Sequence, residues 1–274
     1  MGSSQAPDRE TPALGRAPAV LVVLSGLALV VLLLPVVALL VRTPWTQLVE
    51  RLGTQEILDA LRLSLVSATV AAALCLVLGV PLAWLLARVE FRGRPLVRAF
   101  VTVPLVLPPV VGGIALLMAF GRRGVVGQPM YEAFGITIPF TLTAVVLAQT
   151  FVALPFLVIS VEGALRSADR RYDEVAATLG AGRWSTFRTV TLPLAAPGLI
   201  SGAVLAWARA LGEFGATITF AGNFPGTTRT MPLQIYTARQ ADEGAALVLS
   251  AILLAISVLV LASLRERWIG GTPP

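Results

Sequence analysis

The sequence predicts an all-α protein that crosses a membrane several times, and two observations carry this prediction. Of the 274 residues, 56% are hydrophobic and only 13% are charged. A soluble domain carries roughly 25% charged residues, so this composition is typical of a membrane protein. In addition, six segments are apolar over the length of about 20 residues that a transmembrane helix needs.

The six apolar segments are separated by shorter polar stretches, and each predicts one membrane-spanning helix. They are residues 19–41, 63–87, 99–121, 138–161, 194–220 and 244–264. The first is too long for the apolar region of a cleaved signal peptide, so we expect it to remain as a helix. Residues 1–18 before it have the composition of a disordered polar tail. Only the fifth segment contains charged residues, Arg209 and Glu213.

The basic residues exclude several kinds of site. All 21 of them are arginine, because the chain has neither lysine nor histidine. Without lysine the chain cannot form the Walker A loop that binds ATP phosphates. Without histidine it has no His-ligated zinc, no Ser-His pair and no histidine proton relay. The arginines are scattered among apolar spans and do not gather on one soluble face, so we expect no nucleic-acid binding.

The distribution of arginines predicts the orientation in the membrane. Thirteen lie on the side of both termini and seven on the other side, with Arg209 inside a span. Positively charged loops stay in the cytoplasm, so both termini are predicted to be cytoplasmic. The loop between spans four and five, residues 166–193, is then cytoplasmic as well.

This cytoplasmic loop is the least typical part of the chain. Its first part, SADRRYDEVAATLG, predicts a helix that Ser167 caps and that ends at Gly180. A second short helix, RWSTFRTV, follows and leads through Leu192 and Pro193 into span five. By its composition the first helix could equally enter a groove on a partner protein or rest on the membrane surface.

The order of residues in this loop resembles the EAA loop of ABC importer permeases, E-A-A-x-x-x-G-x9-I-x-L-P. Here the pattern falls on Glu174, Ala176, Ala177 and Gly180, followed by Leu192-Pro193, with Val175 and Val190 at the first alanine and the isoleucine. The resemblance implies that these six residues belong to a coupling helix that sits in a cleft of a separate ATPase subunit.

Spans three and five carry the residues that could line a path. Span three contains Pro108-Pro109 and Gly112-Gly113, which predict a kinked helix that another backbone can approach closely. Such a helix either lines a cavity or serves ordinary packing. In span five, Arg209 and Glu213 are four residues apart, so they share one helix face and can pair. They face either a bundle interior or a water-filled path.

Residues 55–265 resemble the permease subunit of molybdate importers. The likeness is carried by ARALGEFGA at 208–216, by the segment from Gly222 to Thr230 and by LPPVVGG in span three. It implies a type I ABC importer permease fold, with the permease domain at 57–265. The candidates that it suggests for the translocation path are Pro108, Pro109, Gly112, Gly113, Arg209, Gly212, Glu213 and Thr217. The resemblance favours molybdate as the substrate, with tungstate as an alternative that the sequence does not distinguish from it, and a sulfate or thiosulfate permease is the alternative function.

The resemblance also implies the assembly. Two copies of the chain would pair in the bacterial cytoplasmic membrane above a cytoplasmic ABC ATPase dimer, which binds ATP and magnesium. An extracytoplasmic molybdate-binding protein would deliver the anion. The chain itself would hold no metal or cofactor and perform no catalysis. Two rivals from other classes are an ion-coupled secondary transporter that uses Glu213, and an integral membrane enzyme. The sequence shows no inverted repeat for the first and no catalytic cluster for the second.

Overall fold

The computed structural model describes residues 18–269, which are helical or in turns, with no strand among them. The chain divides into two compact units, Met1–Thr43 and Pro44–Pro274. In the first unit, α1 (Ala19–Arg42) has a mean hydropathy of 3.1 over its best window and no buried residue. Its length and composition are those of the first predicted span. The predicted polar tail lies outside the described residues, apart from Pro18.

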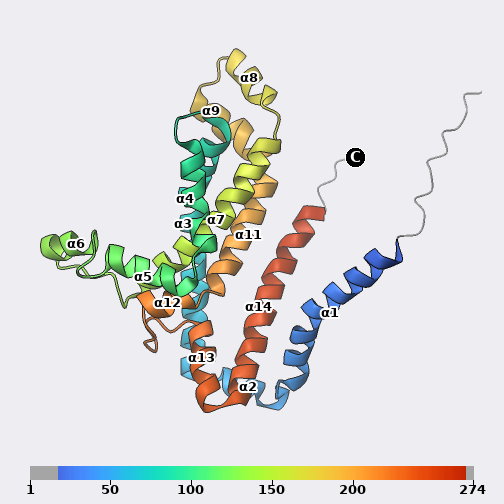
Figure 1. Ribbon diagram of the computed structural model, residues 1–274, viewed down its shortest axis with the longest axis vertical. Coiled ribbons are helices and arrows are strands. Elements are labelled where there is room, and N and C mark those ends of the chain that lie inside the picture. The colour runs from blue at the N-terminus through green and yellow to red at the C-terminus, as the bar shows by residue number, and fades with distance from the viewer. Residues whose placement is uncertain (1–17, 270–274) are drawn as a thin grey trace, which may run out of the picture. The chain divides into compact units, whose positions relative to one another are not determined.

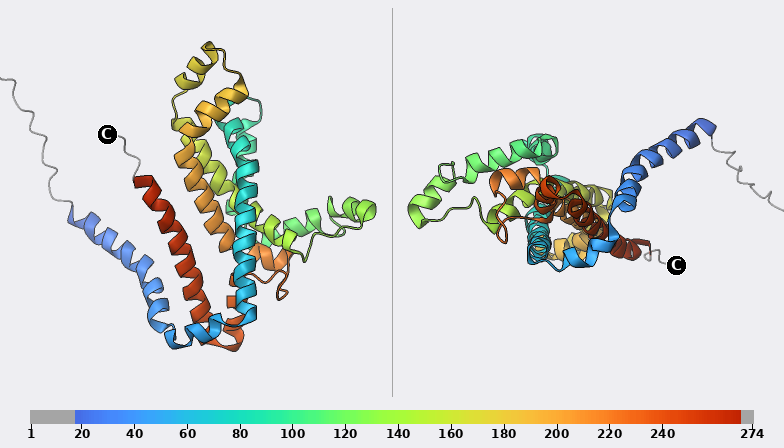
Figure 2. Two further views of the ribbon diagram at one scale, coloured as in Figure 1. Left: turned by 180° about the vertical axis from the view of Figure 1, so that it is seen from behind. Right: turned by 90° about the horizontal axis from the view of Figure 1, so that it is seen from below.

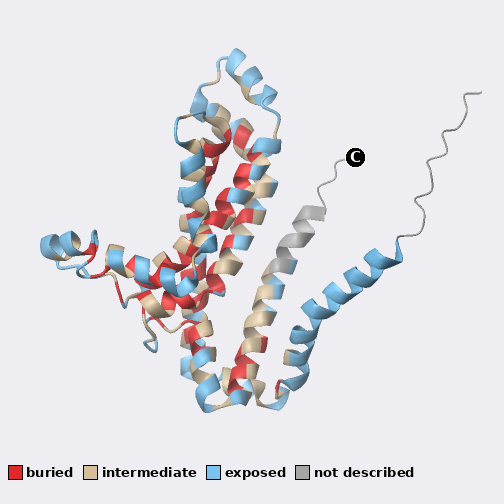
Figure 3. Ribbon diagram, in the orientation of Figure 1, coloured by how far each residue is buried: buried red, intermediate tan, exposed pale blue. Residues whose placement is uncertain are grey.

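The second unit is built around three long helices, α3 (Gln55–Arg88), α7 (Leu142–Ser167) and α11 (Ala196–Leu211). They lie side by side, and the buried residues concentrate where they meet (Figures 1 and 3). Small residues make this packing close: a Cβ on Gly202 of α11 would lie 3.0 Å from the Cβ of Ser160 on α7. Close approach through small residues is the usual way in which membrane helices associate.

The remaining elements surround these three helices. They are η1 (Trp45–Gln47), α2 (Leu48–Leu52), α4 (Arg94–Val106), α5 (Pro109–Phe120), α6 (Gly127–Phe134), α8 (Arg171–Thr178), α9 (Arg183–Thr186), η2 (Phe187–Thr191), α10 (Leu192–Leu194), α12 (Gly215–Phe220), α13 (Met231–Ala241) and α14 (Glu243–Ile269). Within this unit, α8 and α9 lie at one end and α13 and α2 at the opposite end (Figures 1 and 2). Helices α5 and α6 extend sideways from the middle.

The third predicted span, 99–121, is broken rather than merely kinked. The chain bends by 118° between α4 and α5. The break falls on Leu107 and Pro108, both in an extended conformation. A proline disfavours helical geometry in the residue before it, and Pro108 and Pro109 supply no backbone N–H donors. Two consecutive prolines therefore stop α4, and α5 begins again at Pro109.

The fifth predicted span, 194–220, is not one helix either. Helix α11 ends at Leu211, and α12 starts at Gly215 after a non-helical stretch of three residues. At its other end, α11 is joined to the segment Arg183–Leu194 by a bend of 73°. Four described helices are long and apolar enough to cross a membrane, and up to six spans result if each bent pair counts as one. The prediction of an all-α, multi-span membrane protein is confirmed.

Candidate functional site

The break after α11 is organised by Glu213. Its Oε2 lies 2.7 Å from Nη1 of Arg209, and its side chain is only 1% exposed. Its Oε1 accepts a hydrogen bond of 2.8 Å from the backbone N–H of Ala216, in the first turn of α12. The predicted ion pair is therefore present, and the same carboxylate takes the place of a missing backbone acceptor. Glu213 joins the end of α11 to the start of α12.

Helix α12 packs against α5 through two glycines. A Cβ on Gly113 would lie 2.6 Å from the Cβ of Thr219 and 2.9 Å from the carbonyl oxygen of Ala216. A Cβ on Gly215 would lie 2.6 Å from the Cβ of Pro109. Both approaches are closer than a real Cβ allows, so the two helices meet backbone to backbone. The close backbone approach predicted for the two glycines of span three is present at Gly113. At Gly112, a Cβ would instead lie 3.3 Å from the ring of Phe151.

A small cavity of about 130 Å³ lies beside the two breaks. Its lining includes Pro104 and Leu107 before the first break, Pro109 and Gly112 after it, and Arg209. Arg209 is the one charged residue in this lining, and its side chain is 29% exposed. The other residues of the lining are apolar, and the charge of Arg209 is balanced by its ion pair with Glu213.

The other predicted path residues do not line this cavity. Thr217 is fully buried, and its hydroxyl has no hydrogen-bond partner. Gly212 lies instead on a separate hollow of about 350 Å³ that Phe214 and Tyr236 also line. Within residues 18–269, no group of three or more Cys, Asp or Glu side chains is placed to hold a metal ion. The structure thus brings Pro109, Gly112 and Arg209 to one cavity.

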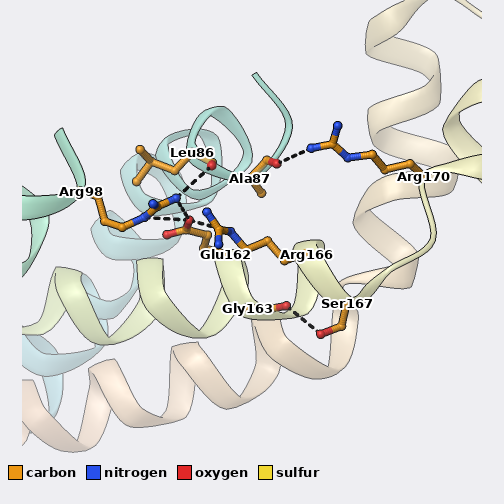
Figure 4. Close-up of polar contacts among 8 residues, drawn as sticks. All are labelled: Leu86, Ala87, Arg98, Glu162, Gly163, Arg166, Ser167 and Arg170. Carbon is orange, nitrogen blue, oxygen red and sulfur yellow. Dashed lines mark hydrogen bonds and ion pairs between the residues drawn. The ribbon is translucent and has the colours of Figure 1, made fainter. Parts of the chain in front are cut away.

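The loop with the EAA-like pattern forms a helical hairpin at one end of the second unit. Helix α8 ends at Thr178, and Gly180 follows with φ +85°, a conformation that suits glycine. The prediction that Ser167 caps this helix is wrong. It ends α7, where its hydroxyl donates to the carbonyl of Gly163 at 3.1 Å (Figure 4). The carboxylate of Asp169 accepts from the N–H of Arg171 at 2.9 Å instead.

Helix α8 and the residue that follows it, Leu179, present apolar side chains outward. Val175 is 56% exposed and Leu179 is 82% exposed. Glu174 and Ala177 are exposed and Ala176 is half-buried. Of the remaining predicted coupling residues, Leu192 is half-buried and Pro193 is exposed in α10. An exposed apolar surface on a short helix is suited to contact with another protein.

Polar contacts that sequence reasoning missed tie this hairpin to the end of α3. Asp173 of α8 accepts a hydrogen bond of 2.8 Å from the hydroxyl of Thr191 and lies 3.4 Å from Nε of Arg88. Arg170 donates to the carbonyl of Ala87 at 3.1 Å (Figure 4). The cation of Arg170 is thus placed at the negative end of α3. These contacts hold the two arms of the hairpin together and against the bundle.

A second cluster joins α4 to α7. The carboxylate of Glu162 is 9% exposed, and its Oε1 accepts from Nε of Arg98 at 3.1 Å and lies 3.0 Å from Nε of Arg166 (Figure 4). Nη2 of Arg98 also reaches the carbonyl of Leu86 at 3.5 Å. The i,i+4 spacing of Glu162 and Arg166 is visible in the sequence. The approach of Arg98 is not, because it depends on how α4 packs.

Comparisons with known proteins agree with this architecture. The family model "Binding-protein-dependent transport system inner membrane component" matches residues 79–270. The chain is 51% identical over 239 residues, 87% of its length and 90% of the relative, to the "Molybdenum transport system permease protein ModB" of Mycobacterium tuberculosis. It is 44% identical over 211 residues to the Escherichia coli protein of the same name, covering 77% of this chain and 92% of that one.

Solved structures share the fold. A chain of a bacterial alginate ABC transporter superimposes with a TM-score of 0.71 and 16% identity, over 93% of this chain and 96% of that one. A chain of the MetNI methionine ABC transporter does so with a TM-score of 0.62 and 18% identity, over 79% and 96%. The fold is thus that of a type I ABC importer permease, as the sequence predicted. Because the family model covers more than half of the chain, this protein belongs to the binding-protein-dependent transport system inner membrane component family.

Proposed function

We propose that this chain is the permease subunit of an ATP-driven importer of molybdate, with tungstate as a second oxyanion that the same path accepts. The observation that carries the proposal is 51% identity over 87% of the chain to a relative named as a molybdenum transport permease. A second relative of that name, in Escherichia coli, is 44% identical. Molybdate and tungstate are tetrahedral dianions of similar size, so both are substrates in this proposal.

The hairpin of α8 and α9 is the proposed contact with a cytoplasmic ABC ATPase dimer, which binds ATP and magnesium. Its exposed Val175 and Leu179 provide an apolar surface that a groove on the partner would cover. The contacts of Asp173 with Thr191 and Arg88 make the hairpin stiff enough to transmit a movement of the ATPase to α3. Glu174, Ala176, Ala177, Gly180, Leu192 and Pro193 keep their proposed role in this coupling.

The translocation path is proposed to run past the two helix breaks, between two copies of the chain. Non-helical backbone at membrane depth is tolerated where it is buried in protein or lines a cavity. The cavity beside Arg209 offers a positive charge to a passing dianion, while Glu213 limits that charge through its ion pair. A moderate field suits transport, because an anion that binds too tightly would not leave.

The arginine distribution supports an orientation with both termini and the α8–α9 hairpin in the cytoplasm of a bacterium. An extracytoplasmic molybdate-binding protein would then deliver the anion to the opposite end of the path. In this arrangement the chain moves its substrate without covalent chemistry and without a resident metal or cofactor.

Uptake of radiolabelled molybdate into proteoliposomes tests the proposal. The vesicles hold this chain with its cognate ATPase and receive the binding protein, with sulfate and tungstate as competitors. We expect uptake that requires ATP, resists excess sulfate and is inhibited by tungstate. Inhibition by modest sulfate would make the protein a sulfate permease. Uptake that ignores ATP and follows a proton gradient would overturn the importer.

A further inference from the structure

An apolar groove of about 720 Å³ lies between α3 and the second arm of the hairpin. One wall is formed by Leu76, Val77 and Pro81 of α3, and the other by Trp184 of α9 and Leu199 of α11. Val77 is 68% exposed, so the groove opens outward from the bundle. The groove shares no lining residue with the cavity beside Arg209, and of the six predicted coupling residues only Leu192 lines it.

Aromatic rings close the groove at its polar end. Trp184 stacks on Phe187 with ring centroids 5.5 Å apart, and Phe187 meets Trp84 of α3 edge to face at 6.0 Å. Trp184 nevertheless remains 73% exposed. Tryptophan is enriched at membrane–water interfaces, where its ring is partly in hydrocarbon and its N–H reaches polar groups. The three rings therefore place this end of the groove at the membrane interface.

The groove has the depth of one membrane leaflet. The lining of the groove on α3 runs from Leu76 to Trp84, over which the helix rises about 12 Å. Half of a bilayer's hydrocarbon core is about 15 Å thick. A helix of another subunit would need a groove that continues over the full bilayer of about 30 Å. This groove stops after one leaflet, which fits acyl chains better than a transmembrane helix.

The side chain of Arg183 lies at the polar end of the groove, where the headgroup of a bound lipid would lie. Arg183 is the one charged residue in the lining of the groove, and it is exposed beside the tryptophans. Arg188 follows on the same arm, and the segment from 183 to 191 contains no acidic residue. On the neighbouring side, the acidic Asp173 is already engaged by Arg88 and Thr191. Glu90 lines the adjoining hollow together with Arg183 and Arg88 but is not part of the lining of the groove, so Arg183 is the charge that the mouth of the groove itself carries.

We propose that the groove binds an anionic phospholipid of the leaflet that faces the α8–α9 hairpin, with its phosphate on Arg183 and its acyl chains along Leu76, Val77 and Pro81. Basic pockets between membrane helices on the cytoplasmic side recognise anionic headgroups in this way. The proposal rests on the proposed function only for the cytoplasmic identity of that leaflet. The lipid would fill the space behind the hairpin and support its second arm.

Quenching of tryptophan fluorescence by brominated lipids tests this site without any transport. The full chain is reconstituted in nanodiscs of phosphatidylcholine that contain increasing fractions of dibromo-phosphatidylglycerol or, separately, dibromo-phosphatidylcholine. The quenching that reports on the groove is the difference between the unchanged chain and the Trp184→Phe variant. We expect the fraction of dibromo-phosphatidylglycerol that gives half-maximal quenching of this signal to be about fivefold lower than the corresponding fraction of dibromo-phosphatidylcholine. This factor corresponds to the contribution of one arginine near an anionic surface.

Arg183→Gln should abolish this preference, whereas Arg188→Gln, on the same arm but outside the groove, should retain it. Equal quenching by the two lipids would overturn the proposal, since bulk lipid would then cover the groove. Absence of quenching by either lipid would also overturn it, because protein would then occupy the groove. Neither outcome depends on molybdate uptake, so failure of the proposed function and failure of the lipid site are distinguishable.

Discussion

Glu213 and Arg209 form an ion pair of 2.7 Å at the end of α11, and the other carboxylate oxygen of Glu213 caps α12 through the N–H of Ala216. The buried side chain of Glu213 therefore fixes both the guanidinium of Arg209 and the first turn of α12 at the break. Because Arg209 also lines the neighbouring cavity, the pair sets how much positive charge the cavity offers. The break and the cavity are two parts of one arrangement.

Replacement of Glu213 should distinguish these two contacts. Glu213→Ala leaves a partly buried arginine unpaired and the N–H of Ala216 without its acceptor, so we expect a loss of about 3 kcal/mol in the free energy of unfolding. Glu213→Gln keeps an oxygen for Ala216 and should lose less. Denaturation in mixed micelles measures both variants. Equal stability of the two variants would contradict the capping role.

Alanine at the two adjacent glycines of α5 should have different effects. Gly113→Ala places a methyl group 2.6 Å from Thr219 and 2.9 Å from a carbonyl of α12, so it must separate the helices. Overpacking of this kind costs about 1–3 kcal/mol. Gly112→Ala meets only the Phe151 ring at 3.3 Å and serves as the matched control. We expect unfolding measurements in micelles to show a loss for the first variant and little change for the second. Similar losses in both would argue against the backbone contact.

Removal of the Thr191 hydroxyl should loosen the hairpin. Thr191→Val deletes the hydrogen bond to Asp173, and a bond to a charged group contributes about 1.5–3 kcal/mol. Hydrogen exchange of the α8 amides should accelerate roughly tenfold. Thr189→Val is the control, because Thr189 bonds only to the carbonyl of Ser185 within its own arm. With the ATPase present, molybdate imported per ATP should fall in Thr191→Val alone. Unchanged exchange in α8 would show that other contacts hold the hairpin.

A charge on the outer surface of the hairpin, at the residue directly after α8, should weaken ATPase binding without unfolding the chain. Leu179→Asp alters a side chain that is 82% exposed, so the isolated chain should keep its unfolding temperature. Co-purification with the ATPase subunit should be lost, because burial of a lone carboxylate in an interface is costly. Val125→Asp, at a position 84% exposed outside the hairpin, is the control. Retention of the ATPase by Leu179→Asp would place the contact elsewhere.

Asp242 predicts a weak dependence of stability on pH. The N–H of Ala245 and then the guanidinium of Arg51 lower the pKa of this carboxyl group, which joins the turn before α14 to α2. A lowered pKa in the folded state means that the stabilisation is present above about pH 4 and is lost as the pH falls through the folded value. Asp242→Asn should lower the unfolding temperature at pH 6, and the gap to the unchanged protein should close towards pH 3. A gap that stays constant with pH would show that the charge contributes nothing. The effect is small because the side chain is 44% exposed.

Much of the fold follows from local features of the sequence. The spans are predicted from composition and length, since a helix in hydrocarbon satisfies its own backbone. The break at Leu107 follows from two consecutive prolines, although the sequence predicted a kink and the structure shows a bend of 118°. The ion pair of Arg209 and Glu213 follows from their spacing on one helix. The turn at Gly180 follows from the EAA-like pattern and the glycine itself.

Other features depend on tertiary structure. No local pattern shows that α11 ends at Leu211, because Glu213 caps α12 only once the two helices are placed. Arg98 meets Glu162 across 64 residues of sequence, and the contact of Arg88 with Asp173 likewise joins different helices. Thus the sequence by itself determined the apolar helices and the interruption at Pro108-Pro109, which arise within a few residues. The tertiary structure alone decided which arginine pairs with which carboxylate and where the cavity and groove lie, because these depend on how distant helices pack side by side.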